Sequence, residues 1–550
     1  MPPSATFQVV DLQDSGTALT VQWRSAPGAH ARPVDATTLD RIGKQVAALA
    51  AAERSAGLTR DIVVPSLLVP GGPGLAAARR ALGETLHELL DGPDRALTRR
   101  VEAARRDGAT LHLVVRLRAA NRTALARHPV LSWHLQLIAS PEGPLALAPD
   151  VTIAVQIGDA EITPQETVPG GRLQVLFMAY SPRDVEPVLD YEAEEERILE
   201  KLAPFVEDRR LVLKVAEDGS LDELRRRLMR RAYDVVHLTG HGVMTDQGPQ
   251  LVMEDATGDR DDVSAEQLLE TLRAGRVMPR LIVISSCHSA EQRADLPSLA
   301  AELIQGGVPC VVGWTRPVRD DVATDAAEAL YRRLCSGDLA TEAVACARRE
   351  LDRDDHGCPR PAHAWATLEF LATKVPGFAI VPDETPVRDA VPAPAFVYRM
   401  LGTRMRVLTE GFVGRRRELQ ALGRILRHGR WTPPDGAERA VAGALVVGMK
   451  GQGKSCLVGR ALDRHHQDTG ELSLVVLHGK LDELQLLEAF RAEAVRLGND
   501  LAERILNDTS RKTPQRIERL LRHYWRERRL VIVLDDFEQN LQISGAGEAR

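Results

Sequence analysis

The clearest pattern of apolar and polar positions lies between residues 171 and 375, where short apolar runs alternate with amphipathic segments. Helices are predicted at 191–202, with apolar residues on one face, and at 220–231, where Ser220 is an N-cap. Continuous runs of Val, Leu and Ile predict buried strands at 173–179, 211–216, 234–239 and 281–286. This alternation predicts an α/β fold with a parallel sheet flanked by helices.

The remaining chain divides into further parts. The N-terminal region has alternating segments at 7–12, 18–23, 111–117 and 151–157, between Ala- and Arg-rich helical stretches. Five prolines and weak periodicity predict a linker at 376–411. The predicted organisation is therefore an N-terminal α+β region at 1–170, an alternating α/β region at 171–375, the linker at 376–411 and a final α/β region at 412–550.

Composition describes an ordinary water-soluble protein. With 550 residues, two to four domains are expected. A net charge of -6 and 27% charged residues argue against bulk affinity for nucleic acid. No signal peptide or long apolar run is visible, so no membrane partner is expected. Abundant Arg and Ala indicate a GC-rich bacterial genome. The six cysteines show no disulfide framework or metal-ligand spacing, which favours a reducing cytoplasm.

A phosphate-binding motif stands in the last region. It follows the apolar run 444–447, which predicts a buried strand, and matches G-x-x-x-x-G-K-[ST]. In such a loop, backbone N–H groups surround phosphate oxygens, the lysine reaches the outer phosphates, and the serine hydroxyl binds Mg²⁺. The predicted ligand is ATP or another nucleoside triphosphate with Mg²⁺, bound by Gly448, Gly451, Gly453, Lys454 and Ser455.

Carboxylates follow a second apolar strand, predicted at 530–534. Ligands of open α/β sheets bind at the carboxyl ends of the strands. Asp535 is expected to hold Mg²⁺ through water, and Asp536 or Glu538 to orient the attacking water. The predicted metal site therefore comprises Ser455, Asp535 and Asp536.

Two further polar residues follow strands of the middle region. The strand at 234–239 leads into Gly240-His241-Gly242, and the strand at 281–286 leads into Cys287. An imidazole beside a thiol activates it as a nucleophile. The N–H groups of Gly242 and Cys287 are candidates for an oxyanion hole. On these residues alone two interpretations stay open: a catalytic dyad, or a buried cysteine and a hydrogen-bonded histidine without catalytic role.

The sequence around this pair resembles the CHAT domain, a caspase-like family of bacterial cysteine peptidases. The similarity is carried by residues 234–242, 284–289 and 298–313; it extends over roughly 100–375 and is strong from 230 to 315 and weak before 130. It implies a caspase-hemoglobinase fold, with His241 as base and Cys287 as nucleophile. It also implies that residues 171–375 form the catalytic half and residues 1–170 a pseudo-caspase half.

Two departures from the family concern substrate selection. The sequence at 312–318, on the strand after Cys287, differs from the family pattern V-G-S-L-W-P-V in the position of its tryptophan. Trp314 and Arg316 are therefore predicted to contact substrate; the alternative is a core tryptophan and a solvated arginine. The cysteine also lies in a run similar to metacaspase D-x-C-H-S, but Ser285 replaces the acidic residue that selects a basic side chain. No preference for Arg or Lys follows.

The segment Phe412-Val-Gly-Arg415-Arg-Arg-Glu418-Leu resembles the entry segment of AAA-like and STAND-type signalling NTPases. Arg415 either contacts the nucleotide or is a solvated residue at a helix start. The resemblance implies that residues 412–550 are the N-terminal part of such a domain. It also implies self-association through this domain and a sensor region beyond residue 550.

Together these features predict a nucleotide-regulated, caspase-like endopeptidase that cleaves a protein substrate in bacterial defence or regulated cell death. A first alternative is a nucleotide-gated switch whose CHAT domain is a non-catalytic scaffold. A second is a transcriptional regulator of the STAND type, but no helix-turn-helix or basic stripe, and hence no nucleic-acid module, is visible.

Overall fold

The computed structural model divides into two compact units, Met1–Arg388 and Asp389–Arg550, which are described separately. No helix in the described residues is long and apolar enough to cross a membrane. The structure describes residues 7–15, 18–24, 31–55, 73–126, 128–158, 172–186, 191–246, 248–286, 298–316, 318, 320–352, 361–373, 414–431, 439–469, 472–498, 500–523, 525 and 530–541.

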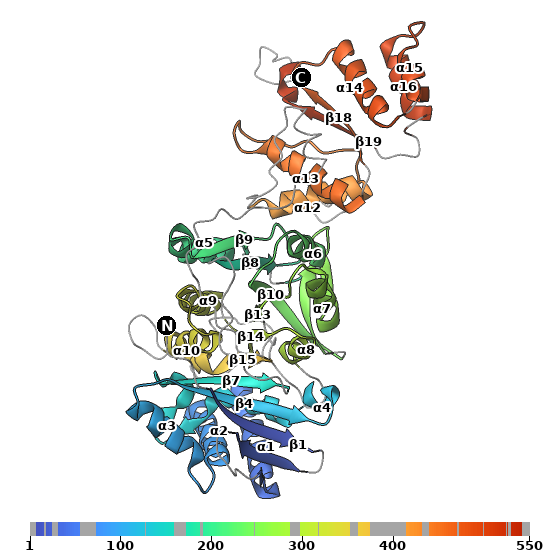
Figure 1. Ribbon diagram of the computed structural model, residues 1–550. Helices are drawn as coiled ribbons and strands as arrows, with labels where there is room; N and C mark the ends of the chain where they lie inside the picture. Colours follow the sequence, from blue (N-terminus) through green and yellow to red (C-terminus); the bar gives the residue numbers. More distant parts are fainter. Residues whose placement is uncertain are drawn as a thin grey trace. The chain divides into compact units, whose positions relative to one another are not determined.

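A mixed sheet of thirteen strands runs through the described part of the first unit (Figure 1). Its order is β12-β11-β10-β13-β14-β15-β7-β4-β1-β2-β3, and β8 and β9 extend from β10. The strands are β1 (Phe7–Asp14), β2 (Leu19–Trp23), β3 (Arg32–Pro33), β4 (Leu111–Ala119), β7 (Val151–Ile157), β8 (Leu173–Tyr180), β9 (Leu211–Val215), β10 (Val235–Thr245), β11 (Gly248–Glu254), β12 (Arg260–Ser264), β13 (Leu281–Ser286), β14 (Cys310–Trp314) and β15 (Leu368–Ala372). A separate short hairpin joins β5 (Ala139–Ser140) and β6 (Gly143–Pro144).

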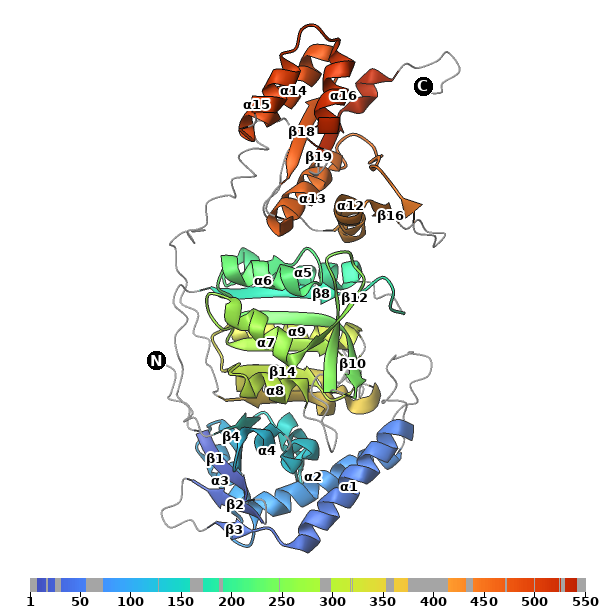
Figure 2. The same cartoon turned by 90° about the vertical axis from the view of Figure 1, so that its right-hand side faces the viewer.

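Helices cover both faces of this sheet. Around β10 and β13, the helices α5, α9 and α10 lie on one face and α6, α7 and α8 on the other (Figure 1), while α1 and α2 pack together beside the N-terminal strands (Figure 2). Their bounds are α1 (Ala36–Ser55), α2 (Pro73–Asp91), α3 (Ala96–Arg106), α4 (Arg122–Ala126), α5 (Tyr191–Glu207), α6 (Leu221–Arg230), α7 (Ala265–Ala274), α8 (Leu299–Gln305), α9 (Asp320–Leu334) and α10 (Ala340–Asp352).

The predicted α/β class is confirmed, and most predicted strands are found within one or two residues. Ser220 caps α6 as predicted, because its hydroxyl accepts a hydrogen bond from the Glu223 N–H. The assignment of residues 1–170 as a pseudo-caspase half stays a prediction. The sheet nevertheless does not break at residue 170, because β7 pairs with β4 on one side and with β15 on the other.

The junction between the two parts of the sheet is narrow. In the described chain, β15 and β7 are joined by two residue pairs, Leu371↔Val155 and Ala372↔Gln156. Arg348 of α10 reinforces this junction by donating to the carbonyls of Leu368 and Ile153, one on each strand. Next to it, Glu369 is buried, and burial raises the pKa of its carboxyl to about 8. Near neutral pH this side chain is therefore largely uncharged.

This raised pKa predicts a pH-dependent contribution to stability. Because the folded protein keeps the Glu369 proton at pH values where the unfolded chain has lost it, this residue lowers the free energy of unfolding as pH rises from about 4.5 to about 8. The slope is at most about 1.4 kcal/mol per pH unit. Glu369→Gln lacks the titrating carboxyl. The difference between the unfolding temperatures of the variant and of wild type is therefore expected to shift in favour of the variant as pH rises from 5 to 8. Parallel curves across this range would contradict the prediction.

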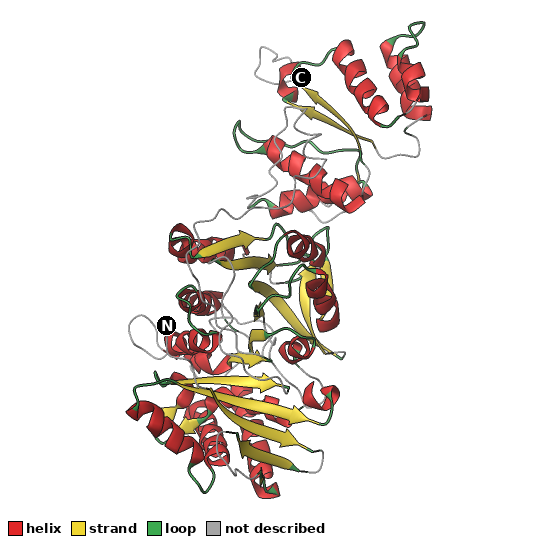
Figure 3. Ribbon diagram, viewed as in Figure 1, coloured by secondary structure: helices red, strands yellow, loops and turns green. Residues whose placement is uncertain are grey.

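The second unit contains a small parallel sheet of β18 (Ser473–His478) and β19 (Leu530–Asp535) with helices around it (Figure 3). A two-residue hairpin, β16 (Arg430–Trp431) and β17 (Arg439–Ala440), lies apart from this sheet. The helices are α12 (Arg416–His428), α13 (Lys454–Thr469), α14 (Glu483–Arg496), α15 (Asp500–Leu506) and α16 (Thr513–His523). Its apolar side chains form three small clusters rather than one continuous core.

One prediction in this unit is wrong. Residues 444–447 are not a strand, and Leu445 and Val447 are 82% and 79% exposed. An apolar run becomes a strand only where a neighbouring strand accepts its backbone hydrogen bonds. Among the described residues no strand pairs with this run, because β19 pairs with β18 alone. The predicted strand at 530–534 is confirmed as β19.

Candidate functional site

The first site lies where β10 changes its neighbours. Up to Gly240, β10 pairs in parallel with β8 and β13, and Gly240 is opposite Tyr180 on one side and Ser286 on the other. From His241 onwards, β10 pairs antiparallel with β11, with His241 opposite Val252. The predicted end of this strand at residue 239 is therefore wrong, and the strand continues to Thr245. The antiparallel hairpin fixes the backbone that carries His241.

Gly240 is required at this position by close packing. A Cβ atom there would lie 2.3 Å from Cδ2 and 2.4 Å from Cε2 of the Tyr180 ring, and its φ is +153°. Gly219 approaches the same tyrosine, since a Cβ there would lie 2.3 Å from the Tyr180 Cβ. Two glycines thus allow the Tyr180 side chain to pack against the end of the sheet beside His241.

A buried relay of hydroxyl and imidazole groups lies below the site on the α5 and α9 face. His237 Nε2 is 3.0 Å from Ser285 Oγ, and its Nδ1 is 3.1 Å from the Tyr331 hydroxyl. Burial lowers the pKa of His237 to about 3, so its ring is neutral at physiological pH. Ser285 therefore has a structural partner on β10, which the sequence did not reveal.

A buried carboxylate approaches the same face from the first turn of α5. Thr239 Oγ1 donates a 2.7 Å hydrogen bond to Glu194 Oε1 and lies 3.3 Å from the Ser285 carbonyl oxygen. Thr239 and His241 project to the same face of β10 because side chains in a strand alternate. Glu194 thus holds the side chain of Thr239, two residues before His241 on β10. The sequence offered only a weak signal for it, namely acidic residues at a helix start.

On the opposite face, Glu254 joins the ends of three strands. Its carboxylate accepts hydrogen bonds from the Ser181 N–H at 2.8 Å and the Gly219 N–H at 3.3 Å. Glu254 is fully buried at the end of β11. Since these N–H groups belong to the turns after β8 and β9, the carboxylate holds those turns against the strand pair that carries His241.

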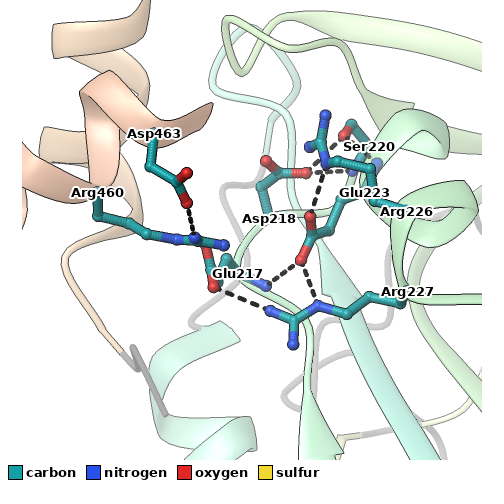
Figure 4. A network of polar contacts seen from close by, with 8 residues as sticks. All are labelled: Glu217, Asp218, Ser220, Glu223, Arg226, Arg227, Arg460 and Asp463. Atoms are coloured by element: carbon teal, nitrogen blue, oxygen red, sulfur yellow. Dashed lines mark hydrogen bonds and ion pairs between the residues drawn. The ribbon is translucent and has the colours of Figure 1, made fainter. Parts of the chain in front are cut away.

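The turn between β9 and α6 is fixed by a second polar network (Figure 4). Ser220 Oγ donates to Asp218 Oδ1 at 2.6 Å. Arg227 donates to Glu223 Oε1 at 2.7 Å and to Glu217 Oε1 at 2.9 Å. These side chains are nearly all buried, so the network contributes to a rigid turn rather than to a solvated surface.

The predicted peptidase residues are described only in part. His241 and Gly242 lie in β10, whereas Cys287 lies outside the described residues. Trp314, at the end of β14, is buried in the core at 2% exposure, in agreement with the alternative interpretation of that residue. Arg316 is also buried, so it is not the solvated residue of that alternative.

Arg316 has a partner that no sequence pattern indicated. Its Nε and Nη2 atoms both lie 2.8 Å from Glu53 Oε2 at the end of α1, and Arg79 Nη2 of α2 lies 3.7 Å from Glu53 Oε1. This ion pair connects the segment after β14 to the N-terminal helices. Glu53 and Arg316 are 263 residues apart in the chain, so the partner is set by the fold alone.

In the second unit, the phosphate-binding motif has the predicted loop-to-helix placement at the start of α13. Gly451 and Gly453 have φ values of +89° and +79°, which glycine adopts readily. Lys454 Nζ donates to the carbonyls of Gly448 at 2.9 Å and Met449 at 3.2 Å. The lysine is therefore folded back over its own loop.

The structure brings the predicted metal residues together. Ser455 Oγ donates a 2.8 Å hydrogen bond to Asp535 Oδ1, although 80 residues separate them. Both belong to the lining of a cavity of about 1050 Å³, together with Lys454, Asp536 and Glu538. No group of three or more His, Cys, Asp or Glu side chains among the described residues is arranged to hold a metal ion by itself.

Comparisons with known proteins identify one part of the chain. No curated protein matches it. Two crystal structures of the Saccharomyces cerevisiae separase–securin complex align at 12% and 13% identity with TM-scores of 0.29, covering 63% of this chain but 23% of the other. The chain therefore spans about a quarter of those structures. The CHAT domain family matches residues 80–373, more than half of the chain. The α/β fold with its large mixed sheet agrees with this caspase-like family, and the chain belongs to the CHAT domain family.

Proposed function

We propose that this protein is a cysteine endopeptidase in which His241 and Cys287 form the catalytic dyad. The observation that carries the proposal is the pairing of Gly240 with Ser286 on adjacent parallel strands. Each of these residues is followed directly by one predicted member of the dyad. Neighbouring strands are about 4.8 Å apart. This pairing brings the backbone of residues 240 and 286 side by side, and both proposed members of the dyad follow it directly in the sequence.

In the proposed reaction, the Cys287 thiolate attacks the carbonyl carbon of a peptide bond and His241 holds the thiol proton. His241 then gives this proton to the leaving amine as the C–N bond breaks. Water hydrolyses the resulting thioester, with His241 as base. The N–H groups of Gly242 and Cys287 are the proposed donors to the oxyanion. Thr239 and Glu194 support the β10 backbone beneath the base.

The experiment that tests this proposal compares cleavage of protein substrates by wild type with cleavage by Cys287→Ala and His241→Ala. The alternative function is a non-catalytic scaffold, which requires neither residue. By the resemblance to regulated CHAT peptidases, the proposed substrate is another protein and the proposed setting is bacterial defence or regulated cell death.

We further propose that the second unit binds a nucleoside triphosphate with Mg²⁺ and regulates the peptidase. The contact between Ser455 and Asp535 supports this, because it brings one hydroxyl and one carboxylate to the same place. Mg²⁺ is usually bound by few protein ligands, and phosphate oxygens and water fill its other coordination positions. The cation, when bound, neutralises phosphate charge. Lys454 is the proposed contact to the outer phosphates, after its amine leaves the carbonyls of its own loop.

Lys454→Ala is expected to weaken ATP binding by about 10-fold or more, because a hydrogen bond to a charged group contributes ~1.5–3 kcal/mol. Wild-type affinity is expected to fall as salt rises, since the exposed loop is screened by ions. Calorimetric titration of the full chain measures both effects, with Lys512→Ala on the exposed surface as the control. Equal affinity of wild type and Lys454→Ala would remove this loop from the nucleotide site.

A further inference from the structure

His478 is a histidine beside the proposed metal site that the sequence analysis did not identify. It ends β18, directly opposite Asp535 in the β18–β19 ladder. Its Nδ1 atom lies 3.3 Å from Asp535 Oδ2, and its Nε2 atom lies 3.2 Å from Asp536 Oδ2. One imidazole ring therefore spans both carboxylates of the proposed site.

The Nδ1 atom of His478 is an orphaned polar atom. It is buried and forms no hydrogen bond with any described residue, because its contact with Asp535 is poorly aligned. A buried nitrogen without a partner costs free energy, so such atoms in native proteins call for an explanation. Ser455 Oγ donates to the other carboxylate oxygen of Asp535, Oδ1, so Oδ2 is the oxygen that lies beside this nitrogen.

The backbone around these three side chains is held by a compact set of hydrogen bonds. The Gly479 N–H donates to the Asp535 carbonyl at 2.9 Å. The Asn540 amide donates to the Gly479 carbonyl at 2.8 Å and accepts from the Leu481 N–H at 2.8 Å. The ends of β18 and β19 thus move as one piece, so that His478 keeps a fixed position relative to the two aspartates.

The backbone of Asp536 is itself unusual. Its φ of +54° and ψ of +37° lie in the left-handed region, which Asp enters more readily than most residues other than glycine. This turn directs the Asp536 carboxylate back toward the end of β18, where Nε2 of His478 contacts it. This backbone conformation therefore brings both carboxylates to one imidazole ring.

We propose that His478 is a positioning residue for the divalent cation that accompanies the nucleotide: it orients Asp535 and Asp536 for the cation and its water ligands. This inference rests on the proposed nucleotide binding of the second unit. Mg²⁺ requires near-octahedral geometry, so the orientation of its carboxylate partners controls its affinity. Imidazole is a poor ligand for this hard cation, so His478 acts through the carboxylates. Removing such an outer partner typically costs about 10–100-fold in metal affinity.

The test measures ATP affinity of the full-length chain by calorimetry, once with Mg²⁺ and once with a chelator. The readout is the gain in affinity that Mg²⁺ produces, which does not depend on turnover. In His478→Ala this gain is expected to shrink about 10-fold, whereas affinity in chelator stays at the wild-type value.

Two conservative variants separate the two ring contacts. In His478→Asn the amide nitrogen replaces Nδ1 toward Asp535, and in His478→Gln it replaces Nε2 toward Asp536. At least one of these two variants is expected to restore part of the Mg²⁺-dependent gain in affinity. Restoration by His478→Asn indicates that the contact with Asp535 orients the site, and restoration by His478→Gln indicates the contact with Asp536. They also keep the test informative if His478→Ala unfolds. His523→Ala, on the exposed surface of α16, is the matched control.

Each outcome has a distinct meaning. If wild type shows a Mg²⁺-dependent gain and His478→Ala retains all of it, His478 has no positioning role. The same holds if every His478 variant loses affinity equally in Mg²⁺ and in chelator, since that loss is structural. If Lys454→Ala binds ATP as tightly as wild type, the proposed nucleotide site is wrong and this inference is overturned with it.

Discussion

Cys287→Ala and His241→Ala are each expected to lower peptide-bond cleavage at least about 1,000-fold, and the double variant little further. The thiol and its base act as one unit, so removing either abolishes the covalent step and their effects are not additive. The measurement is the rate of cleavage of a protein substrate, or of the chain itself, by the three variants and wild type. Circular dichroism verifies that the fold is retained.

The matched controls are Cys346→Ala, a half-exposed cysteine on α10, and His523→Ala. Both are expected to retain wild-type cleavage. A thiol-directed peptide probe adds an independent readout, because a catalytic Cys287 is labelled faster in wild type than in His241→Ala. Cleavage at near wild-type rates by Cys287→Ala, with no labelling of Cys287, would support the non-catalytic scaffold instead.

Gly240→Ala is expected to abolish cleavage and to lower the free energy of unfolding of the first unit by several kcal/mol. Overpacking costs about 1–3 kcal/mol in ordinary cores, and it costs more where the backbone must move. The added Cβ would lie 2.4 Å from the Tyr180 carbonyl oxygen as well as 2.3 Å from its ring. Neither the backbone nor a ring packed in the core can yield without shifting β8. Thermal unfolding and cleavage assays measure the two effects.

The control for this variant is Gly43→Ala. Gly43 lies in α1 with no atom within 4 Å of an added Cβ, and alanine favours a helix by about 1 kcal/mol. That variant is expected to be as stable as wild type or more so. Full stability of Gly240→Ala would show that the close approach of Tyr180 is not maintained in solution.

Local patterns were sufficient for the elements of the first unit that are buried on both faces. The alternating segment at 151–157 predicted a strand, and the structure shows β7 there with all seven residues buried. The second half of β10 was missed because Gly240 and Gly242 interrupt the apolar pattern and its half-buried residues gain strand structure by pairing with β11. A single-sequence pattern contains no information about such a partner.

Residue type and spacing predicted that Lys454, Ser455 and Asp535 lie together, and the structure places all three along one cavity, although their nucleotide binding stays a prediction. Contacts between residues far apart in the chain were not predictable. Glu194 meets Thr239 across 45 residues, and His478 meets Asp535 across the β18–β19 ladder. The apolar run at 444–447 is not a strand, because hydrophobicity alone does not supply a neighbouring strand.

The change of partners along β10 has a consequence for the local stability of the protein. Amides up to Gly240 belong to a ladder between two parallel neighbours, β8 and β13, whereas those from His241 to Thr245 belong to the antiparallel β10–β11 hairpin near one end of the sheet. Opening the hairpin exposes much less surface than opening the sheet, so the two segments exchange amide hydrogens at different free energies. The proposed base therefore lies on the less stable side of this boundary, and a partner that binds the hairpin can alter the base without unfolding the core.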